Sequence, residues 1–211
     1  YIATLWRGSI ELNTAMLFAV GMLAEFLIGG VTGIFNGSAA ADIYLHDTYF
    51  VVAHFHYTLF PVTFLGAFAG IYYWFPKMFG RHLNETWGKV HFWVTTVSFN
   101  FVFIPMFGMG LAGHQRRIFD PTFFDYLQPH QHLHVIATIG LIVMLAGQIP
   151  FIVNWLISLK RGKVAEKNPW RAATLEWQAP SPPGHGNFEI DPVVVRGPYD
   201  YSLPGLKGRD F

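Results

Sequence analysis

The chain has 211 residues, of which 52% are hydrophobic, 18% aromatic and 13% charged. A soluble domain carries about 25% charged residues, so the composition argues against an ordinary soluble globule. Fourteen Lys and Arg nearly balance thirteen Asp and Glu, which argues against nucleic acid or a polyanionic substrate as the partner. Cysteine is absent, so the chain holds neither a disulfide nor a thiolate metal site.

Four long tracts of the sequence are almost free of charge. A bilayer core about 30 Å thick needs about 20 apolar residues in a helix, and each tract is that long. We predict an all-α membrane domain over 1–161, with transmembrane helices over about 13–35, 49–76, 90–113 and 133–159. The rival interpretation, a large soluble core, would need four consecutive helices of about twice the usual length.

The segment 162–211 holds seven of the thirteen prolines and six glycines. That composition is typical of irregular structure, so we predict a polar tail whose Trp170, Trp177 and Tyr199 could dock it against a partner. At the other end, the chain opens on Tyr1, and the short apolar stub there is expected to be the cut end of an earlier helix.

The basic residues predict how the four helices are oriented, because Lys and Arg gather in cytoplasmic loops. One side of the membrane receives eight of them: Arg7, Lys77, Arg81, Lys89, Lys160, Arg161, Lys163 and Lys167. We therefore expect the tail to be cytoplasmic. The opposite side receives the adjacent pair Arg116 and Arg117, which needs anionic partners. Lipid phosphates, or Asp120 and Asp125, are one interpretation.

The second tract contains two histidines, His54 and His56, inside a charge-free run. Ionisable groups at that depth are costly and functional by default. Residues two apart on a helix project about 200° from each other, so the two rings cannot bind one ion. The spacing favours one ligand for each of two separate groups, and a neutral imidazole suits haem iron. Hydrogen bonds to neighbouring helices are the alternative.

His46 and Asp47 lie just outside that helix, at the outer interface. An imidazole beside a carboxylate can hold Mg²⁺ or Mn²⁺, with water or another chain completing the octahedral shell. The alternative is a helix N-cap at Asp47 or Thr48, because Asp and Thr are both favoured there.

Glu25 is the one charged residue inside a predicted span. An unpaired charge near mid-membrane costs about 3 kcal/mol or more, so we expect this carboxyl to be protonated, paired or facing water. A contribution to a proton path is a hypothesis. His130, His132 and His134 precede or begin the fourth span, and we interpret them as interfacial residues rather than as a metal site.

The run from His46 to Tyr57 resembles the signature of subunit I of the haem-copper terminal oxidases, specifically the cytochrome c oxidase branch. Shorter matches cover essentially the whole chain, and those in the tail resemble bacterial members. They are Gly29-Gly30-Val31-Thr32-Gly33-Ile34, Tyr73-Trp74-Phe75-Pro76, Asn84-Glu85-Thr86-Trp87-Gly88-Lys89, Arg116-Arg117, Asn168-Pro169-Trp170, Leu175-Glu176-Trp177 and Pro180-Ser181-Pro182-Pro183.

The resemblance implies that these four helices are the last four of a twelve-helix bundle. It also implies the activity, which is reduction of oxygen to water with electrons from cytochrome c, coupled to proton translocation. A quinol oxidase of the same superfamily and a non-catalytic membrane scaffold or channel segment are the alternatives. A bacterial type favours a prokaryotic plasma membrane over the mitochondrial inner membrane.

Roles follow from the resemblance residue by residue. His54 would be the axial ligand of the high-spin haem where oxygen reacts, and His56 an axial ligand of the low-spin haem. Phe55 would lie between the two haems, which are expected to be a-type. Arg116 and Arg117 would pair with haem propionates.

At the outer interface, the resemblance implies that His46 and Asp47 bind Mg²⁺ or Mn²⁺, completed by a ligand from subunit II. Asp42 matches a carboxylate in the watery region above the propionates. The copper ligands of the family have no match in this chain, so they would come from the remainder of subunit I. The other implied partners are a copper-bearing subunit II, subunit III, cytochrome c, oxygen and membrane lipid, with no nucleic acid.

Overall fold

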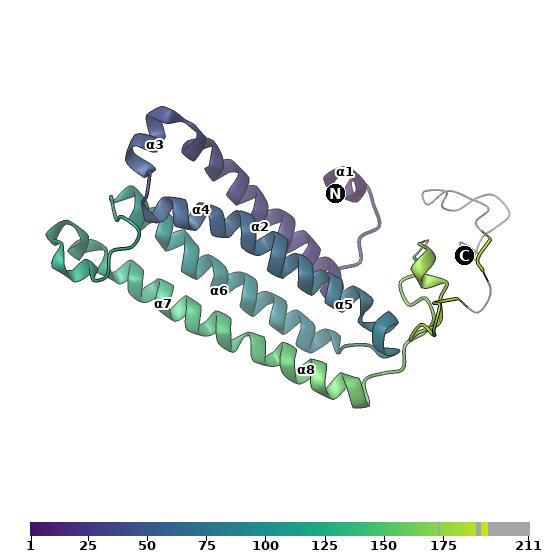
Figure 1. Ribbon diagram of the computed structural model, residues 1–211. Coiled ribbons are helices and arrows are strands. Elements are labelled where there is room, and N and C mark those ends of the chain that lie inside the picture. The colour runs from purple at the N-terminus through teal and green to yellow at the C-terminus, as the bar shows by residue number, and fades with distance from the viewer. Residues whose placement is uncertain (173, 189–190, 194–211) are drawn as a thin grey trace. The chain divides into compact units, whose positions relative to one another are not determined.

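The computed structural model describes residues 1–172, 174–188 and 191–193, and in that part of the chain the regular elements are helices (Figure 1). The prediction of an all-α fold is confirmed. The elements are α1 (Ile2–Leu5), α2 (Thr14–Gly37), α3 (Ala39–Leu45), α4 (Tyr49–Phe60), the π-helix η1 (Pro61–Leu65), α5 (Gly66–Phe79), α6 (Glu85–Leu111), the 3₁₀-helices η2 (Pro121–Phe123) and η3 (Asp125–His130), α7 (Gln131–Ala146), α8 (Gln148–Arg161) and the 3₁₀-helix η4 (Leu175–Trp177).

Four helical segments are long and apolar enough to cross a membrane, which confirms the predicted number of spans. They cover Thr14–Gly37, Tyr49–Phe79, Glu85–Leu111 and Asp125–Arg161. The first two begin within one residue of their predicted starts, whereas the third begins five residues and the fourth eight residues earlier than predicted. The predicted ranges were taken from the charge-free tracts. The helices extend past those tracts because their end turns also include charged residues, such as Glu85 and Asp125.

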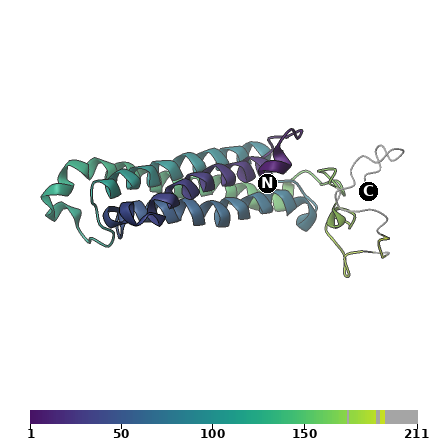
Figure 2. The ribbon, with the colours of Figure 1, turned by 90° about the horizontal axis from the view of Figure 1, so that it is seen from above.

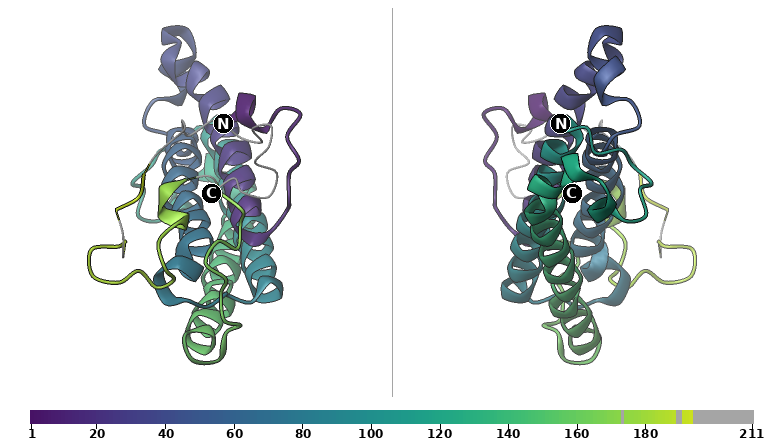
Figure 3. Two further views of the ribbon diagram at one scale, coloured as in Figure 1. Left: turned by 90° about the vertical axis from the view of Figure 1, so that its right-hand side faces the viewer. Right: turned by 90° about the vertical axis from the view of Figure 1, so that its left-hand side faces the viewer.

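The chain divides into two compact units, the first formed by 1–70 and 85–152 and the second by 71–84 and the chain from 153 onward. In the first unit, α2, α4, α6 and α7 lie side by side (Figures 1 and 2). Helix α6 packs against α7, α4 and α2, and α4 also packs against α2. The two side views show these helices obliquely and foreshortened (Figure 3).

Glycines allow the helices of the first unit to approach closely. A β-carbon added at Gly29 of α2 would lie 2.7 Å from the carbonyl oxygen of Tyr57 in α4, and one added at Gly110 of α6 would overlap the backbone of Phe50. Because backbone atoms cannot rotate away, both contacts require glycine. The helix that carries the two histidines is thus held closely on two sides.

The centre of the first unit is aromatic. Tyr57, Phe99, Val102 and Phe103 form one buried cluster at the contact between α4 and α6. The ring of Tyr57 meets that of Phe99 edge-on with centroids 4.9 Å apart, a geometry that aromatic pairs favour. Apolar surface gains little by leaving lipid, so the interhelical packing itself stabilises such a bundle.

A proline interrupts the second span. Pro61 has no N–H to continue the α-helical bonding of α4, and the chain passes through η1, where the N–H of Gly66 donates to the carbonyl of Pro61. Such π-turns are uncommon and often lie near functional sites. The α-helical part of the histidine-bearing segment therefore ends at Phe60, four residues beyond His56.

In the second unit, the described part of the tail packs against the end of α5. The indole Nε1 of Trp170 donates to the carbonyl of Tyr73 at 2.8 Å, and Trp177 is 1% exposed. The ammonium of Lys77 donates to the carbonyl of Ala179 at 2.6 Å. Two of the aromatic residues predicted to dock on a partner therefore dock within the chain itself, and Tyr199 lies outside the described residues.

Candidate functional site

Helix α4 begins at a short pairing with the loop that follows α6. The hydroxyl of Thr48 accepts a hydrogen bond from the N–H of Phe50 at 3.2 Å, so Thr48, and not Asp47, caps the helix. The N–H of Tyr49 donates to the carbonyl of His114 at 2.9 Å. Because Thr48 satisfies the helix end, the carboxylate of Asp47 is available for other contacts.

That carboxylate forms an ion pair with an arginine of the loop. Oδ1 of Asp47 lies 2.9 Å from Nε of Arg116, and the N–H of Arg116 donates to the carbonyl of Asp47 at 2.8 Å. The interpretation in which Asp120 or Asp125 partners the arginines is wrong for Arg116. Oδ1 of Asp120 instead accepts from Thr122, and these hydrogen bonds lower the pKa of Asp120.

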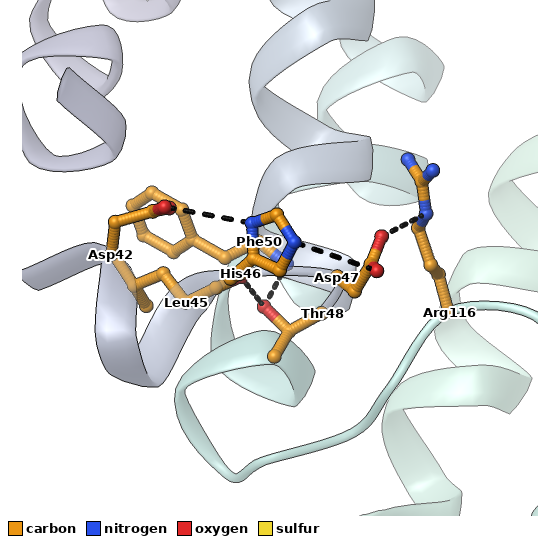
Figure 4. Close-up of polar contacts among 7 residues, drawn as sticks. All are labelled: Asp42, Leu45, His46, Asp47, Thr48, Phe50 and Arg116. Carbon is orange, nitrogen blue, oxygen red and sulfur yellow. Dashed lines mark hydrogen bonds and ion pairs between the residues drawn. The ribbon is translucent and has the colours of Figure 1, made fainter.

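The imidazole of His46 stands between two carboxylates at this end of α4 (Figure 4). Its Nδ1 lies 3.5 Å from Oδ2 of Asp42, and its Nε2 lies 3.6 Å from Oδ2 of Asp47. The side chain of His46 is 71% exposed, so solvent reaches it.

Asp42, His46 and Asp47 supply only some of the ligands that a hard divalent cation needs. No group of three or more metal-binding side chains in a ligating arrangement occurs among the residues that the structure describes. Oδ2 of Asp47 and Nε2 of His46 face each other and are close enough to bind one cation at octahedral distances of about 2.1 Å. The two residues therefore fit a site that water or another chain must complete.

His54 is held on the side of α4 that faces α2. Its Nδ1 lies 3.0 Å from the carbonyl oxygen of Gly29 and 3.2 Å from the hydroxyl of Thr32. A β-carbon added at Gly33 would lie 3.0 Å from its Cε1 atom. One turn of α2 thus fixes the orientation of the ring.

His56 is held on the side of α4 that faces α6. Its ring stacks on Phe103 with centroids 4.3 Å apart and an interplanar angle of 19°. Its Nδ1 lies 2.8 Å from the carbonyl oxygen of Val52, one turn earlier in the same helix. The two histidines face different helices, as their spacing predicted.

The two imidazoles share one bonding pattern. A carbonyl oxygen only accepts hydrogen bonds, so Nδ1 of each ring carries the proton and Nε2 presents its lone pair. Among the described residues, neither Nε2 atom has a hydrogen-bond partner. A metal-binding histidine usually anchors its second nitrogen on a carbonyl in this way, so both residues fit axial ligation of haem iron.

Phe55 and Arg117 are the remaining residues of the predicted site. The ring of Phe55 lies 4.5 Å from that of His56, centroid to centroid. Arg117 follows Arg116 with a left-handed backbone, φ +71°, and is exposed. The structure thus brings Arg116 to Asp47, and it leaves Arg117 at the surface of this chain.

Sequence reasoning missed a buried imidazole beside α4, that of His114. The ring of His114 is 1% exposed and lies 4.3 Å from the ring of Tyr49 and 4.8 Å from that of His134, centroid to centroid. Burial lowers the pKa of His114, and a hydrogen bond with the carbonyl of Gln115 opposes that effect. His132 is exposed and His134 is half-buried.

A family model described as cytochrome c and quinol oxidase polypeptide I matches residues 1–143. A cytochrome c oxidase subunit 1 from Synechocystis sp. is 50% identical over 205 residues, and one from Thermostichus vulcanus is 48% identical over 205 residues. Each alignment covers 96% of this chain and 36% of the relative. The chain therefore spans about a third of the length of these relatives.

Two further comparisons agree with these. An alternative cytochrome c oxidase subunit 1 from Bradyrhizobium diazoefficiens is 43% identical over 214 residues, covering 100% of this chain and 36% of the relative. The fold is similar to that of a chain in a cryo-EM structure of a heme-copper terminal oxidase dimer, with a TM-score of 0.62 and 22% identity. That match covers 72% of this chain and 28% of the other.

Proposed function

Because this chain belongs to the cytochrome c and quinol oxidase polypeptide I family, we propose that it is the C-terminal part of the catalytic subunit I of a respiratory terminal oxidase. The complete enzyme would reduce oxygen to water with electrons from cytochrome c and couple this reaction to proton translocation. This chain would supply one axial ligand to each of two a-type haems.

The observation that carries this proposal is the shared geometry of His54 and His56. Each ring has Nδ1 on a backbone carbonyl and an Nε2 lone pair without a hydrogen-bond partner among the described residues. They project to different sides of one helix, toward α2 and α6. Two imidazoles that merely joined neighbouring helices would be expected to use both ring nitrogens.

In this proposal, His54 ligates the high-spin haem and His56 the low-spin haem. The haem irons, with a copper whose ligands come from outside this chain, would supply the electron transfer and the oxygen chemistry. The residues of this chain orient those groups. Gly29 and Thr32 hold His54, while Val52 and Phe103 hold His56. The ring of Phe55 would lie between the haems.

At the outer end of α4, His46 and Asp47 would bind Mg²⁺ or Mn²⁺ together with a ligand from subunit II. Arg116 and Arg117 would pair with haem propionates, since guanidinium groups suit carboxylates and stay charged. Nε of Arg116 already contacts Oδ1 of Asp47. Its Nη atoms would therefore face the propionate, and the carboxylate would link the cation to the arginine.

Cytochrome c is the proposed electron donor, because the relatives reported above are named cytochrome c oxidase subunit 1. A quinol donor is the competing candidate, since the family description includes both classes. Oxidation of reduced cytochrome c by the purified complex would support the first, and oxidation of quinol alone would support the second.

The protein is an integral membrane protein of this family, and we place it in a prokaryotic plasma membrane because the relatives above come from bacteria. The tail would be cytoplasmic, since Lys77, Arg81 and the basic exit of α8 all belong to the second unit. Within the second unit, the N–H of His82 donates to the carbonyl of Lys163 at 2.8 Å. The remainder of subunit I, subunit II and subunit III would complete the complex.

Absorption spectroscopy of the purified native complex tests the haem ligands. We expect reduced haem bands, with one set lost in His54→Ala and the other in His56→Ala. His132→Ala is the matched control, because His132 is an exposed histidine of the same chain. A colourless complex that contains every native subunit would overturn the proposal and favour a non-catalytic scaffold.

A further inference from the structure

A buried carboxyl group lies in the middle of the candidate membrane span α2, one turn before Gly29. Glu25 is 4% exposed and is the only charged residue of α2. It lies about 18 Å along the helix from Asn13, by a rise of 1.5 Å per residue. At this depth an ion without a partner costs about 3 kcal/mol or more.

Glu25 ends a chain of hydrogen bonds that joins three helices. The hydroxyl of Tyr57 in α4 donates to Oδ1 of Asn100 in α6 at 2.7 Å. The amide of Asn100 donates to Oε1 of Glu25 at 2.6 Å, and its second proton goes to the carbonyl of Thr96 at 2.9 Å. Both amide protons and the amide oxygen are thus in use.

The second oxygen of this carboxyl has a different environment. Oε2 of Glu25 is buried and has no hydrogen-bond partner among the residues that the structure describes, and the same holds for the hydroxyl of Thr96. Buried polar atoms are rarely left without a partner. Water is the partner that buried polar groups commonly recruit, and Oε2 of Glu25 and the hydroxyl of Thr96 are two such groups beside one amide.

The helices around Glu25 carry no cation that could neutralise it. Neither α2, α4 nor η1 contains Lys or Arg, and the one basic residue of α6, Lys89, lies about 16 Å along the helix from Asn100. Away from the helix ends, the other titratable groups of these helices are Tyr57, His54, His56 and His91. Of these, His54 bonds Gly29, His56 bonds Val52 and His91 bonds Gln148.

We propose that Glu25 is a proton-binding site, protonated at rest, which exchanges its proton with water at Oε2. The O–H bond of the carboxylic acid breaks, the proton passes to water, and the return of a hydronium proton restores the acid. Asn100 cannot carry the proton, because an amide does not ionise and its hydrogen-bonding atoms are occupied. Asn100 and Tyr57 instead position the carboxyl group.

Infrared difference spectroscopy of the intact complex, wild type minus Glu25→Gln, tests this assignment independently of the haems. We expect one carbonyl band of a protonated carboxylic acid to be lost in the variant, and the band to shift in D₂O. Loss of carboxylate bands without any carboxylic acid band would show that Glu25 is ionised and overturn the proposal. Glu11→Gln is the matched control, since Glu11 is exposed.

Two more variants separate a proton-binding role from a structural one. Tyr57→Phe removes the donor to Asn100, so we expect the Glu25 band to shift, whereas Tyr44→Phe at a 79% exposed site leaves it in place.

If Glu25→Gln does not assemble, Glu25→Asp keeps the acid and should move the band. A carboxylic acid band that is identical in wild type and Glu25→Asp would overturn the proposal.

Discussion

Nε of Arg116 lies 2.9 Å from Oδ1 of Asp47, and the backbone N–H of Arg116 donates to the carbonyl of the same aspartate at 2.8 Å. The arginine thus contacts Asp47 through both side chain and backbone. This double contact fastens the loop after α6 to the first turn of α4. It also leaves Oδ2 of Asp47 facing His46, so one carboxylate serves the loop and the candidate cation site together.

Asp47→Asn should remove the divalent cation and leave the fold intact. The cation loses its one anionic ligand in this chain, so we expect its affinity to fall by about 10-fold or more. The ion pair with Arg116 is partly exposed, so its loss should change the free energy of unfolding by less than about 1 kcal/mol. Metal analysis of the purified complex measures the first effect, and thermal unfolding measures the second.

Arg116→Gln separates the two roles of that carboxylate. It removes the ion pair but keeps both candidate ligands, so the cation content should remain near the wild-type value. Equal loss of cation from the Arg116 and Asp47 variants would show that the ion pair, and not ligation, maintains the site.

Gly33→Ala should disturb the candidate high-spin haem alone. The new β-carbon would lie 3.0 Å from Cε1 of His54, so the ring must move by a few tenths of an ångström. We expect the absorption bands of the haem bound by His54 to shift, while those of the other haem stay. Gly30→Ala is the matched control, because nothing lies within 4 Å of its added β-carbon. Identical spectra for the two variants would contradict this prediction.

Gly110→Ala should prevent α6 from packing on α4. The added carbon would overlap the backbone of Phe50, and overpacking typically costs about 1–3 kcal/mol, more where backbone must move. We expect a loss of about 3 kcal/mol or more, seen as a lower unfolding temperature and lower yield of complex. At Gly108 the nearest atom is a side-chain carbon of Leu133 at 3.6 Å, so Gly108→Ala should be nearly silent. Equal stability of both variants would refute the close approach.

His114 should make the folded protein sensitive to acid. Burial lowers its pKa, so the folded chain binds this proton less tightly than the unfolded chain, whose histidines titrate near pH 6.5. The contribution of a neutral His114 to stability is therefore fully present above about pH 6.5 and is lost as the pH falls below that value. His114→Phe should weaken the drop in unfolding temperature between about pH 7 and pH 5.

His132→Phe is the control for that acid effect, because it removes a histidine that is exposed and not buried. It should retain the wild-type dependence on pH. If His114→Phe showed the same dependence as wild type, another group would have to account for the acid sensitivity.

The membrane spans could be predicted because they depend on local composition. A run of apolar residues long enough for a bilayer identifies a helix whatever surrounds it, and a spacing of two places the two histidines on different sides of α4. The π-helical segment that begins at Pro61 and continues into α5 was not predicted, because a proline within a span does not specify how the helix adapts to it.

The contacts that join distant parts of the chain could not be predicted. Asp47 and Arg116 were both singled out, but for different partners, because no periodicity relates residues so far apart in sequence. The link from Glu25 through Asn100 to Tyr57 was missed for the same reason, since a neutral amide inside a span gives no signal of its own. Where His114 lies depends on the fold of a loop.

The anchors of the two α4 histidines differ in one further respect. His56 bonds the carbonyl of Val52 in its own helix, whereas His54 bonds the carbonyl of Gly29 in a neighbouring helix. The orientation of the first ring can therefore form together with the helix during biogenesis. The second ring acquires its orientation only when α4 has packed against α2, so one of the two candidate ligands would be oriented before the other.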